Sequence, residues 1–358
     1  MKKLIPKIIW CLLFICININ FSFADVTKRA HLQGSVVDRN TGKPIHFVNV
    51  FLSNTMIGTT TDRNGKYNMS NVPFGTYDLI ISMMGYHTEV IQLKLFDKKI
   101  KIVDIRLRQK LLEFPEIQVE AKSDKVWEKN YIKFKREFFG NTGNSEKCKI
   151  MNPGVLNFVL NKEDGVFSAS AQVPLEVVNN ALGYKIFCVI RTFRIQGTRL
   201  EYYVEPKFEN LITENQDQQK RWLKNRVAAY RGSIRHFFHS LINDRLFEEG
   251  FVIWSLLGDM KHPIRGDELE KLFSKTDIES EMKIHLPRLV EVKYMREYDD
   301  VKNRENQISR MEVLLDSFDI AKAGYLVDHK PLVQHGYWSY ERIADLLPYE
   351  FDVNHPEK

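Results

Sequence analysis

Turn-forming residues recur at short intervals between residues 31 and 121 and limit every ordered segment there to a few residues. The stretches 40–44 and 62–65 have the composition of tight turns, with Gly65 suited to a positive φ. Between such turns lie short apolar and β-branched runs, and over 77–82 Tyr77, Leu79 and Ile81 alternate with Asp78, Ile80 and Ser82. About seven short strands at a spacing of roughly 8–12 residues, without a helical period, predict a β-sandwich.

The glycines, aspartates and tyrosines of this segment follow a characteristic order. They form the strings Gly34-x-Val36-x-Asp38, Thr41-Gly42-x-Pro44-Ile45, Asn49-Val50, Gly58-x-x-Thr61-Asp62-x-x-Gly65-x-Tyr67, Val72-x-x-Gly75-x-Tyr77 and Gly85-Tyr86. This order resembles the carboxypeptidase-like regulatory domain over about 90 residues. The resemblance implies a transthyretin-like β-sandwich over residues 25–121. In Gram-negative bacteria, such domains precede TonB-dependent outer-membrane receptors and many other exported proteins.

The resemblance does not extend to the zinc chemistry of carboxypeptidases. None of the ten His residues has Glu three positions later, and the string His-Glu-x-x-His is absent. Asp62 and Asn64 have two interpretations, as residues that stabilise a turn or as calcium ligands, and calcium requires more carboxylates nearby. We therefore expect no metal site and no cofactor.

Residues 1–24 have the three parts of a secretory signal peptide. Lysines precede an apolar run over 8–19, and Ser22 and Ala24 are the small residues before a cleavage site at Asp25. The apolar run is shorter than the roughly 20 residues that span a bilayer, although an uncleaved anchor is the alternative. We expect an exported protein, in the periplasm or associated with the outer membrane of a Gram-negative cell.

Removal of this segment changes both the charge and the cysteine content. The net charge of +6 falls to +3 because the segment carries three Lys and no acidic residue, so no nucleic-acid partner is indicated. Cys11 and Cys16 leave with it. Cys148 and Cys188 remain in an oxidising compartment, where they either form a disulfide or stay as two buried thiols.

Residues 122–358 predict a second, larger domain of mixed character. Aromatic residues recur at helical spacing from Trp127 to Phe138, and Gly140 ends that helix. Alternating strands follow over 156–160, 167–173, 184–195, 200–204, 290–294 and 311–315, with a hairpin turn at 163–165. The predicted fold class is α+β and mostly β: a transthyretin-like sandwich followed by a larger antiparallel-sheet domain with one long helix.

The long helix is predicted over 214–247. Its apolar stripe consists of Leu223, Val227, Tyr230, Ile234, Phe238 and Leu241. The neighbouring face carries the basic residues Lys220, Lys224, Arg231, Arg235 and His239. That face is a candidate site for anionic lipid or an acidic partner, or else a solvated surface.

Within this helix, Gly232 is followed by a possible nucleophile and base. Ser233 and His236 are three positions apart and within reach of each other on a helix, which makes them the catalytic candidates for a hydrolase or peptidase. No orienting carboxylate or oxyanion hole is visible, so a close helix crossing at Gly232 is the favoured interpretation. We expect Gly232→Leu to destabilise the protein through overpacking.

The string 336–348 predicts a short amphipathic helix that Pro348 ends. Tyr337 and Trp338 either pack into the core or stack on a sugar, and in the second case they are binding residues. Together with the string at Tyr230, this ending resembles exported proteins that join the regulatory domain to a C-terminal region of unknown function.

Three functions remain after these observations. The favoured one is a non-enzymatic envelope protein that binds a protein, glycan or lipid partner. The second is a hydrolase or peptidase that uses Ser233 and His236. The third is an accessory to a TonB-dependent outer-membrane transporter, because about 235 residues after the sandwich are too few for the transporter itself.

Overall fold

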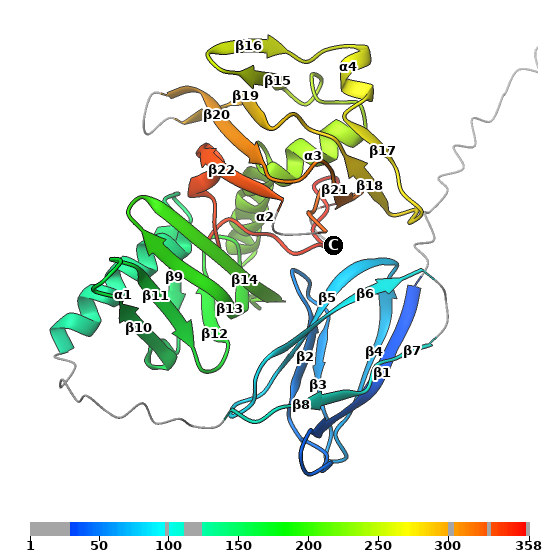
Figure 1. Ribbon diagram of the computed structural model, residues 1–358, viewed down its shortest axis with the longest axis vertical. Coiled ribbons are helices and arrows are strands. Elements are labelled where there is room, and N and C mark those ends of the chain that lie inside the picture. Colours follow the sequence, from blue (N-terminus) through cyan, green and yellow to red (C-terminus); the bar gives the residue numbers. More distant parts are fainter. Residues whose placement is uncertain (1–28, 97–99, 111–123, 300–303, 328–330, 356–358) are drawn as a thin grey trace, which may run out of the picture.

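The computed structural model describes residues 29–96, 100–110, 124–299, 304–327 and 331–355 (Figure 1). The side chains of 297–306 are outside this description. The predicted signal peptide over 1–24 also lies outside the described residues. The fold is mostly β, with antiparallel sheets predominating and few helices, as the sequence predicts.

Two sheets face each other in the N-terminal sandwich. One sheet has the order β4-β1-β7 with β8 also on β1, and the other has the order β3-β2-β5-β6. Their strands are β1 (Arg29–Asp38), β2 (Asn49–Leu52), β3 (Gly58–Thr60), β4 (Lys66–Pro73), β5 (Gly75–Ser82), β6 (Glu89–Leu95), β7 (Ile100–Ile102) and β8 (Ile105–Leu107). Inward-facing apolar residues, among them Leu32, Val50 and Leu79, are fully buried between the sheets. The predicted sandwich is confirmed.

A six-stranded sheet covered by a helix follows. Its order is β10-β11-β13-β12-β9, and β14 pairs along the other edge of β13. The elements are α1 (Asp124–Phe139), the 3-10 turns η1 (Ser145–Lys147) and η2 (Pro153–Val155), and the strands β9 (Cys148–Ile150), β10 (Leu156–Leu160), β11 (Phe167–Ala171), β12 (Leu175–Asn179), β13 (Tyr184–Gln196) and β14 (Arg199–Asn210). Phe134 and Phe138 of α1 are fully buried in the core of this sheet, and Gly140 follows the helix with φ +88°, as predicted.

A second antiparallel sheet and a small three-stranded sheet complete the chain, in the orders β16-β15-β19-β20-β22 and β17-β18-β21. Their elements are β15 (Phe251–Leu257), β16 (Met260–Pro263), α4 (Asp267–Glu270), β17 (Phe273–Lys275), β18 (Glu281–Ile284), β19 (Leu289–Asp299), β20 (Arg304–Val313), β21 (Phe318–Ala321), β22 (Leu332–Gly336) and η3 (Tyr337–Tyr340). The short helix predicted over 336–348 is wrong: only a 3-10 turn forms, and the chain then continues irregularly.

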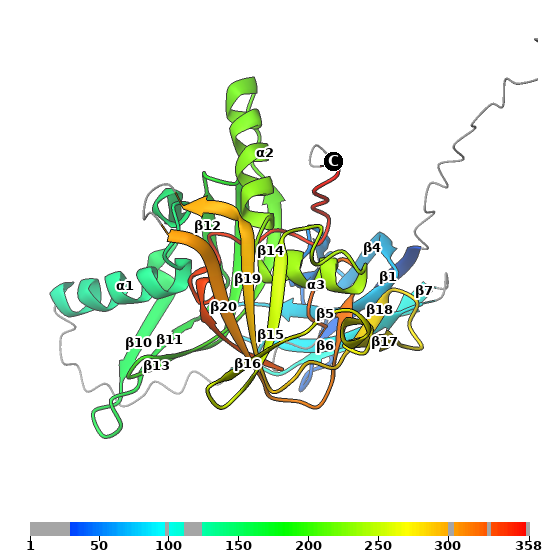
Figure 2. The ribbon, with the colours of Figure 1, turned by 90° about the horizontal axis from the view of Figure 1, so that it is seen from above.

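The single helix predicted over 214–247 is also wrong. Two helices, α2 (Gln216–Tyr230) and α3 (Ile234–Ile242), meet at Gly232, whose φ is +79°. Ser233 caps α3, because its hydroxyl accepts a hydrogen bond from the backbone N–H of His236 at 3.2 Å. The break divides the apolar stripe: Tyr230 packs into the core of the six-stranded sheet, whereas Phe238 packs into that of the next sheet. Figure 2 shows α2 standing out from the sheets.

The sandwich contacts the six-stranded sheet through the loop between β2 and β3. Asn54, with φ +60°, donates its N–H to the carbonyl of Pro206 at 2.7 Å, and its own carbonyl accepts the N–H of Tyr349 at 2.8 Å. The N–H of Phe208 donates to the carbonyl of Thr55 at 2.9 Å. This loop is therefore held by backbone hydrogen bonds between β14 and the C-terminal segment.

Both cysteines of the sheet are free thiols. Cys148 is on β9 and Cys188 on β13, and β12 lies between these strands. Two strand spacings are about 9–10 Å, whereas the Cα atoms of a disulfide are less than about 7 Å apart. Of the two alternatives that the sequence leaves open, the structure has the pair of thiols.

Candidate functional site

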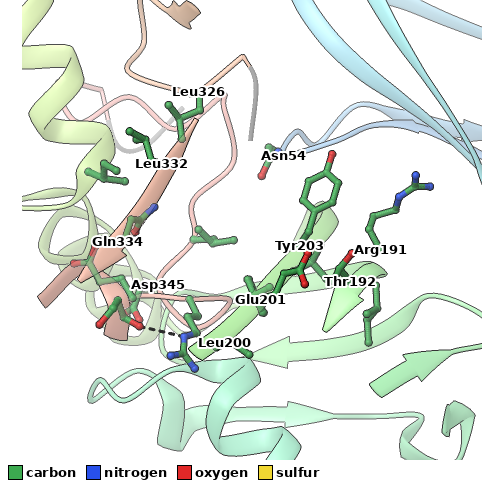
Figure 3. Close-up of a pocket in the computed structure, with 18 of the residues that line it drawn as sticks. Asn54, Arg191, Thr192, Leu200, Glu201, Tyr203, Leu326, Leu332, Gln334 and Asp345 are labelled. Atoms are coloured by element: carbon green, nitrogen blue, oxygen red, sulfur yellow. Dashed lines mark hydrogen bonds between the residues drawn. The ribbon is translucent and has the colours of Figure 1, made fainter. Parts of the chain in front are cut away.

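A groove of about 1600 Å³ lies where the sandwich, the six-stranded sheet and the C-terminal part of the chain meet (Figure 3). Asn54 and His87 reach it from the sandwich, and β22 and η3 form the opposite wall. β13 and β14 contribute Val189–Thr192 and residues 199–204. The groove is therefore built from segments that are far apart in the sequence.

The side chains on the β14 wall divide by chemistry. Leu200 and Val204 are partly buried and pack against the core of the six-stranded sheet. Tyr203, opposite Thr192 in the ladder, belongs to the other face of the strand. Burial, and after it the nearby Glu205 carboxylate, raise the pKa of Tyr203 above its usual range, so its hydroxyl stays protonated at neutral pH. The wall thus offers an apolar face and a polar face.

The C-terminal wall carries charged groups that are held by the protein. Arg342 forms an ion pair with Glu137 at 2.9 Å. The carboxylate of Asp345 accepts hydrogen bonds from the Thr142 hydroxyl at 2.8 Å and from the Asn144 amide at 2.8 Å. Burial raises the pKa of Asp345 to about 6, against the opposing effect of these hydrogen bonds. Positive and negative groups are mixed along the groove, which does not favour a strongly charged ligand.

The two catalytic candidates do not form a nucleophile–base pair. The Ser233 hydroxyl donates to the carbonyl of Tyr230 at 2.7 Å and accepts from the backbone of His236. The Nδ1 atom of His236 accepts the N–H of Gly232 at 3.1 Å, and its Nε2 atom lies 3.5 Å from a Glu249 carboxylate oxygen. Burial, the largest effect, lowers the pKa of His236 to about 4. Both side chains hold the junction of α2 and α3.

The predicted basic face divides between solvent and the interior. Lys220, Lys224 and Arg231 are exposed, and none of them lines the groove. Arg235 points inward and donates to the backbone carbonyls of Pro348 and Phe351 at 3.2 and 2.6 Å. Its guanidinium also lies 3.9 Å from the centre of the Tyr325 ring. Arg235 therefore anchors the C-terminal segment, and it also lines the groove.

The two C-terminal aromatic candidates differ in burial. Trp338 is 2% exposed and donates its indole N–H to the carbonyl of Gly232 at 2.7 Å, so of its two expected alternatives the structure has packing into the core. Tyr337 is partly buried against the same core. Sequence reasoning missed Tyr340, which is 41% exposed and lines the groove, and Tyr203. Nothing in the local sequence distinguishes them from core tyrosines.

The described residues contain no cluster of three or more His, Cys, Asp or Glu side chains that could hold a metal ion. The Asp62 carboxylate accepts the N–H groups of Asn64 and Lys66 at 2.8 and 2.9 Å, which confirms its interpretation as a turn-stabilising residue. Among the helices of the described part of the chain, none is long and apolar enough to cross a membrane.

The N-terminal segment folds as a β-sandwich, and sequence comparison finds a family model that matches it. Residues 32–119 match the model of the CarboxypepD_reg-like domain family. A segment of 100 residues, 28% of this chain, is 31% identical to part of the TonB-dependent receptor P39 of Formosa agariphila. That segment spans 9% of the receptor.

Solved structures show only remote likeness. A cohesin–X-dockerin complex from Acetivibrio cellulolyticus matches 21% of this chain and 52% of its own, with 23% identity and a TM-score of 0.19. A putative carbohydrate binding protein from Bacteroides uniformis matches 82% of this chain and 98% of its own, with 10% identity and a TM-score of 0.18. A putative membrane-associated protein of unknown function from Bacteroides fragilis matches 86% and 97%, with 11% identity and a TM-score of 0.19. Because these TM-scores are below 0.5, the likenesses carry no weight for function.

Proposed function

We propose that this protein is an exported, non-enzymatic module of the bacterial cell envelope that binds a partner in the groove between its sandwich and its C-terminal region. The groove itself supports this proposal most strongly, because it combines a volume of about 1600 Å³ with walls from three separate parts of the chain. Its mixed polar, aromatic and apolar lining is typical of a recognition surface.

The location in the envelope is supported by two further observations. The family of residues 32–119 and the likeness to a segment of a TonB-dependent receptor both favour a protein of the Gram-negative envelope. The signal peptide expected over 1–24 favours export to the periplasm or the outer membrane. We propose that the chain acts beside such a receptor as an accessory and does not transport a substrate itself.

A matched pair of charge reversals tests the proposal. Arg191 and Arg194 are both exposed on β13, but only Arg191 lines the groove. The native envelope is crosslinked, the protein is purified, and its partners are identified by mass spectrometry. Arg191→Glu is expected to abolish recovery of a partner that Arg194→Glu recovers at the wild-type level. Equal recovery with both variants contradicts a binding role for the groove.

A further inference from the structure

The outer edge of β14 is occupied over only part of its length. On its inner side, β14 pairs with β13 from Arg199 to Asn210. On its outer side, the Asn54 N–H donates to the Pro206 carbonyl and the Phe208 N–H donates to the Thr55 carbonyl. These two bonds join the loop between β2 and β3 to β14 in the manner of an added strand.

Over the remainder of this edge, no backbone hydrogen bond from the described residues reaches the outward main-chain groups. Backbone groups alternate in direction along a strand, so residues two apart direct their N–H and C=O groups to the same side. Pro206 and Phe208 face outward, and Leu200, Tyr202 and Val204 therefore face outward as well. The register of the β13–β14 pair shifts between Ile190 and Thr192, where Arg191 is an extra residue of β13. This bulge lies in β13, so the backbone groups of β14 still alternate in direction. Within the described ranges, no strand pairs with this edge over residues 199–204.

The groove runs along this free edge and has the chemistry of a strand site. Leu200 and Val204 present apolar side chains on one face of β14, close to Leu346 in the same lining. Tyr203 and Thr192 present polar groups on the other face. An exposed edge strand can bind an extended peptide through main-chain hydrogen bonds. Alternate side chains of the peptide then contact the two faces of the sheet. Figure 3 shows Tyr203 and Thr192 on the side of the groove opposite Leu332.

We propose that an extended segment of a partner protein adds as a strand to β14 along residues 199–204. The segment continues the edge that Asn54 and Thr55 already occupy, between the residues of the sandwich and those of β22 that line the same groove. Its residues alternate between apolar side chains that face Leu200 and polar side chains that face Tyr203. This proposal rests on the proposed function, because it names the class of partner for the same groove.

Hydrogen exchange of individual amides tests the free edge without any ligand. The mature protein is exchanged in deuterated buffer and read at single-residue resolution. We expect the amides of Tyr202 and Val204 to exchange quickly, and those of Tyr203 and Glu205, which point toward β13, to exchange slowly. Equal and strong protection of all four amides shows that the edge is already paired and overturns the proposal.

A proline substitution tests strand addition itself. Val204→Pro removes one N–H that faces outward from β14. The native Pro206 is two residues away and faces the same side, which shows that β14 accepts proline at an outward-facing position. Val204→Ala, the control, shortens the side chain and keeps the N–H. The probe is a randomised peptide library displayed on phage and selected on the wild-type protein. Selected peptides are expected to alternate apolar and polar residues and to bind Val204→Pro about tenfold more weakly or worse, with Val204→Ala much less affected.

Other outcomes separate this proposal from the proposed function. Failure to select any peptide, or equal binding to Val204→Pro and Val204→Ala, overturns strand addition. The melting temperature shows whether Val204→Pro is folded. If that variant is unfolded, Leu200→Pro is used instead, because Leu200 also faces outward. If Arg191→Glu loses the envelope partner and a folded proline variant keeps it, the groove binds its partner in another way. If all these variants keep the partner, both proposals fail.

Discussion

Gly232 lies at the junction of α2 and α3, which pack against different sheets. Its replacement by leucine tests whether this junction requires glycine. Its φ of +79° lies in the left-handed region, which costs other residues about 1–2 kcal/mol. Its N–H donates to His236 and its carbonyl accepts from Trp338, so the backbone is fixed on both sides. Gly232 is buried, and a leucine side chain there adds about 1–3 kcal/mol of overpacking. Backbone strain is thus added to the overpacking expected from sequence, because the glycine lies between two helices and not inside one.

The expected loss of about 2–5 kcal/mol corresponds to a fall in melting temperature of roughly 5–15 °C for a region of this size. Gly197→Leu is the matched control: Gly197 has φ +57° in the β13–β14 hairpin, and a Cβ atom there meets nothing within 4 Å. Gly197→Leu therefore introduces the backbone strain without the steric overlap, and its melting temperature is expected to fall by about 2–6 °C. Differential scanning calorimetry measures both variants. Equal falls for both, or an unchanged melting temperature for Gly232→Leu, refute the reasoning.

Three further predictions concern buried groups. Because burial lowers the pKa of His236 to about 4, the unfolded chain binds the proton first, and stability falls as the pH drops from about 6.5 to about 4, by up to about 3 kcal/mol. Urea titrations across that range should show a smaller decline for His236→Asn than for the wild type; an equal decline excludes His236 as the cause. Trp338→Phe leaves the Gly232 carbonyl without its donor and should lower the free energy of unfolding by about 1–3 kcal/mol in the same assay, whereas a change near zero contradicts a role for that bond. Cys148 and Cys188 should both react with a thiol reagent once the mature protein is unfolded without reductant, and failure of both to react indicates a disulfide.

Strands that alternate clearly were predictable from sequence, because burial of one sheet face imposes a period of two. The hairpin at 163–165 and the long pair β13 and β14 follow that rule, and both are present. The helix break was not predicted, since the spacing of four from Tyr230 to Ile234 continues the helical period across Gly232. A glycine followed by serine, which suits a helix end and then a helix cap, was the available signal.

The groove could not be predicted from spacing in the sequence. Asn54, Val204 and Tyr340 line the same groove because the sandwich loop docks against β14 and the C-terminal segment is hydrogen-bonded to that loop. The charge of Arg235 suggested a surface role, whereas its guanidinium satisfies the backbone carbonyls of a segment more than 100 residues away in the chain. Tertiary contacts of this kind leave no local pattern.

Photocrosslinking from inside the groove is the most direct test of the central claim, that the groove binds an envelope partner. Tyr340 lines the groove and is 41% exposed, whereas Phe247 is 84% exposed and lies outside it. Each is replaced in turn by p-benzoylphenylalanine, a photoreactive aromatic residue, and intact cells are irradiated. We predict a discrete adduct to one partner protein from position 340 and none from position 247. No adduct from position 340, or the same adducts from both positions, contradicts the claim.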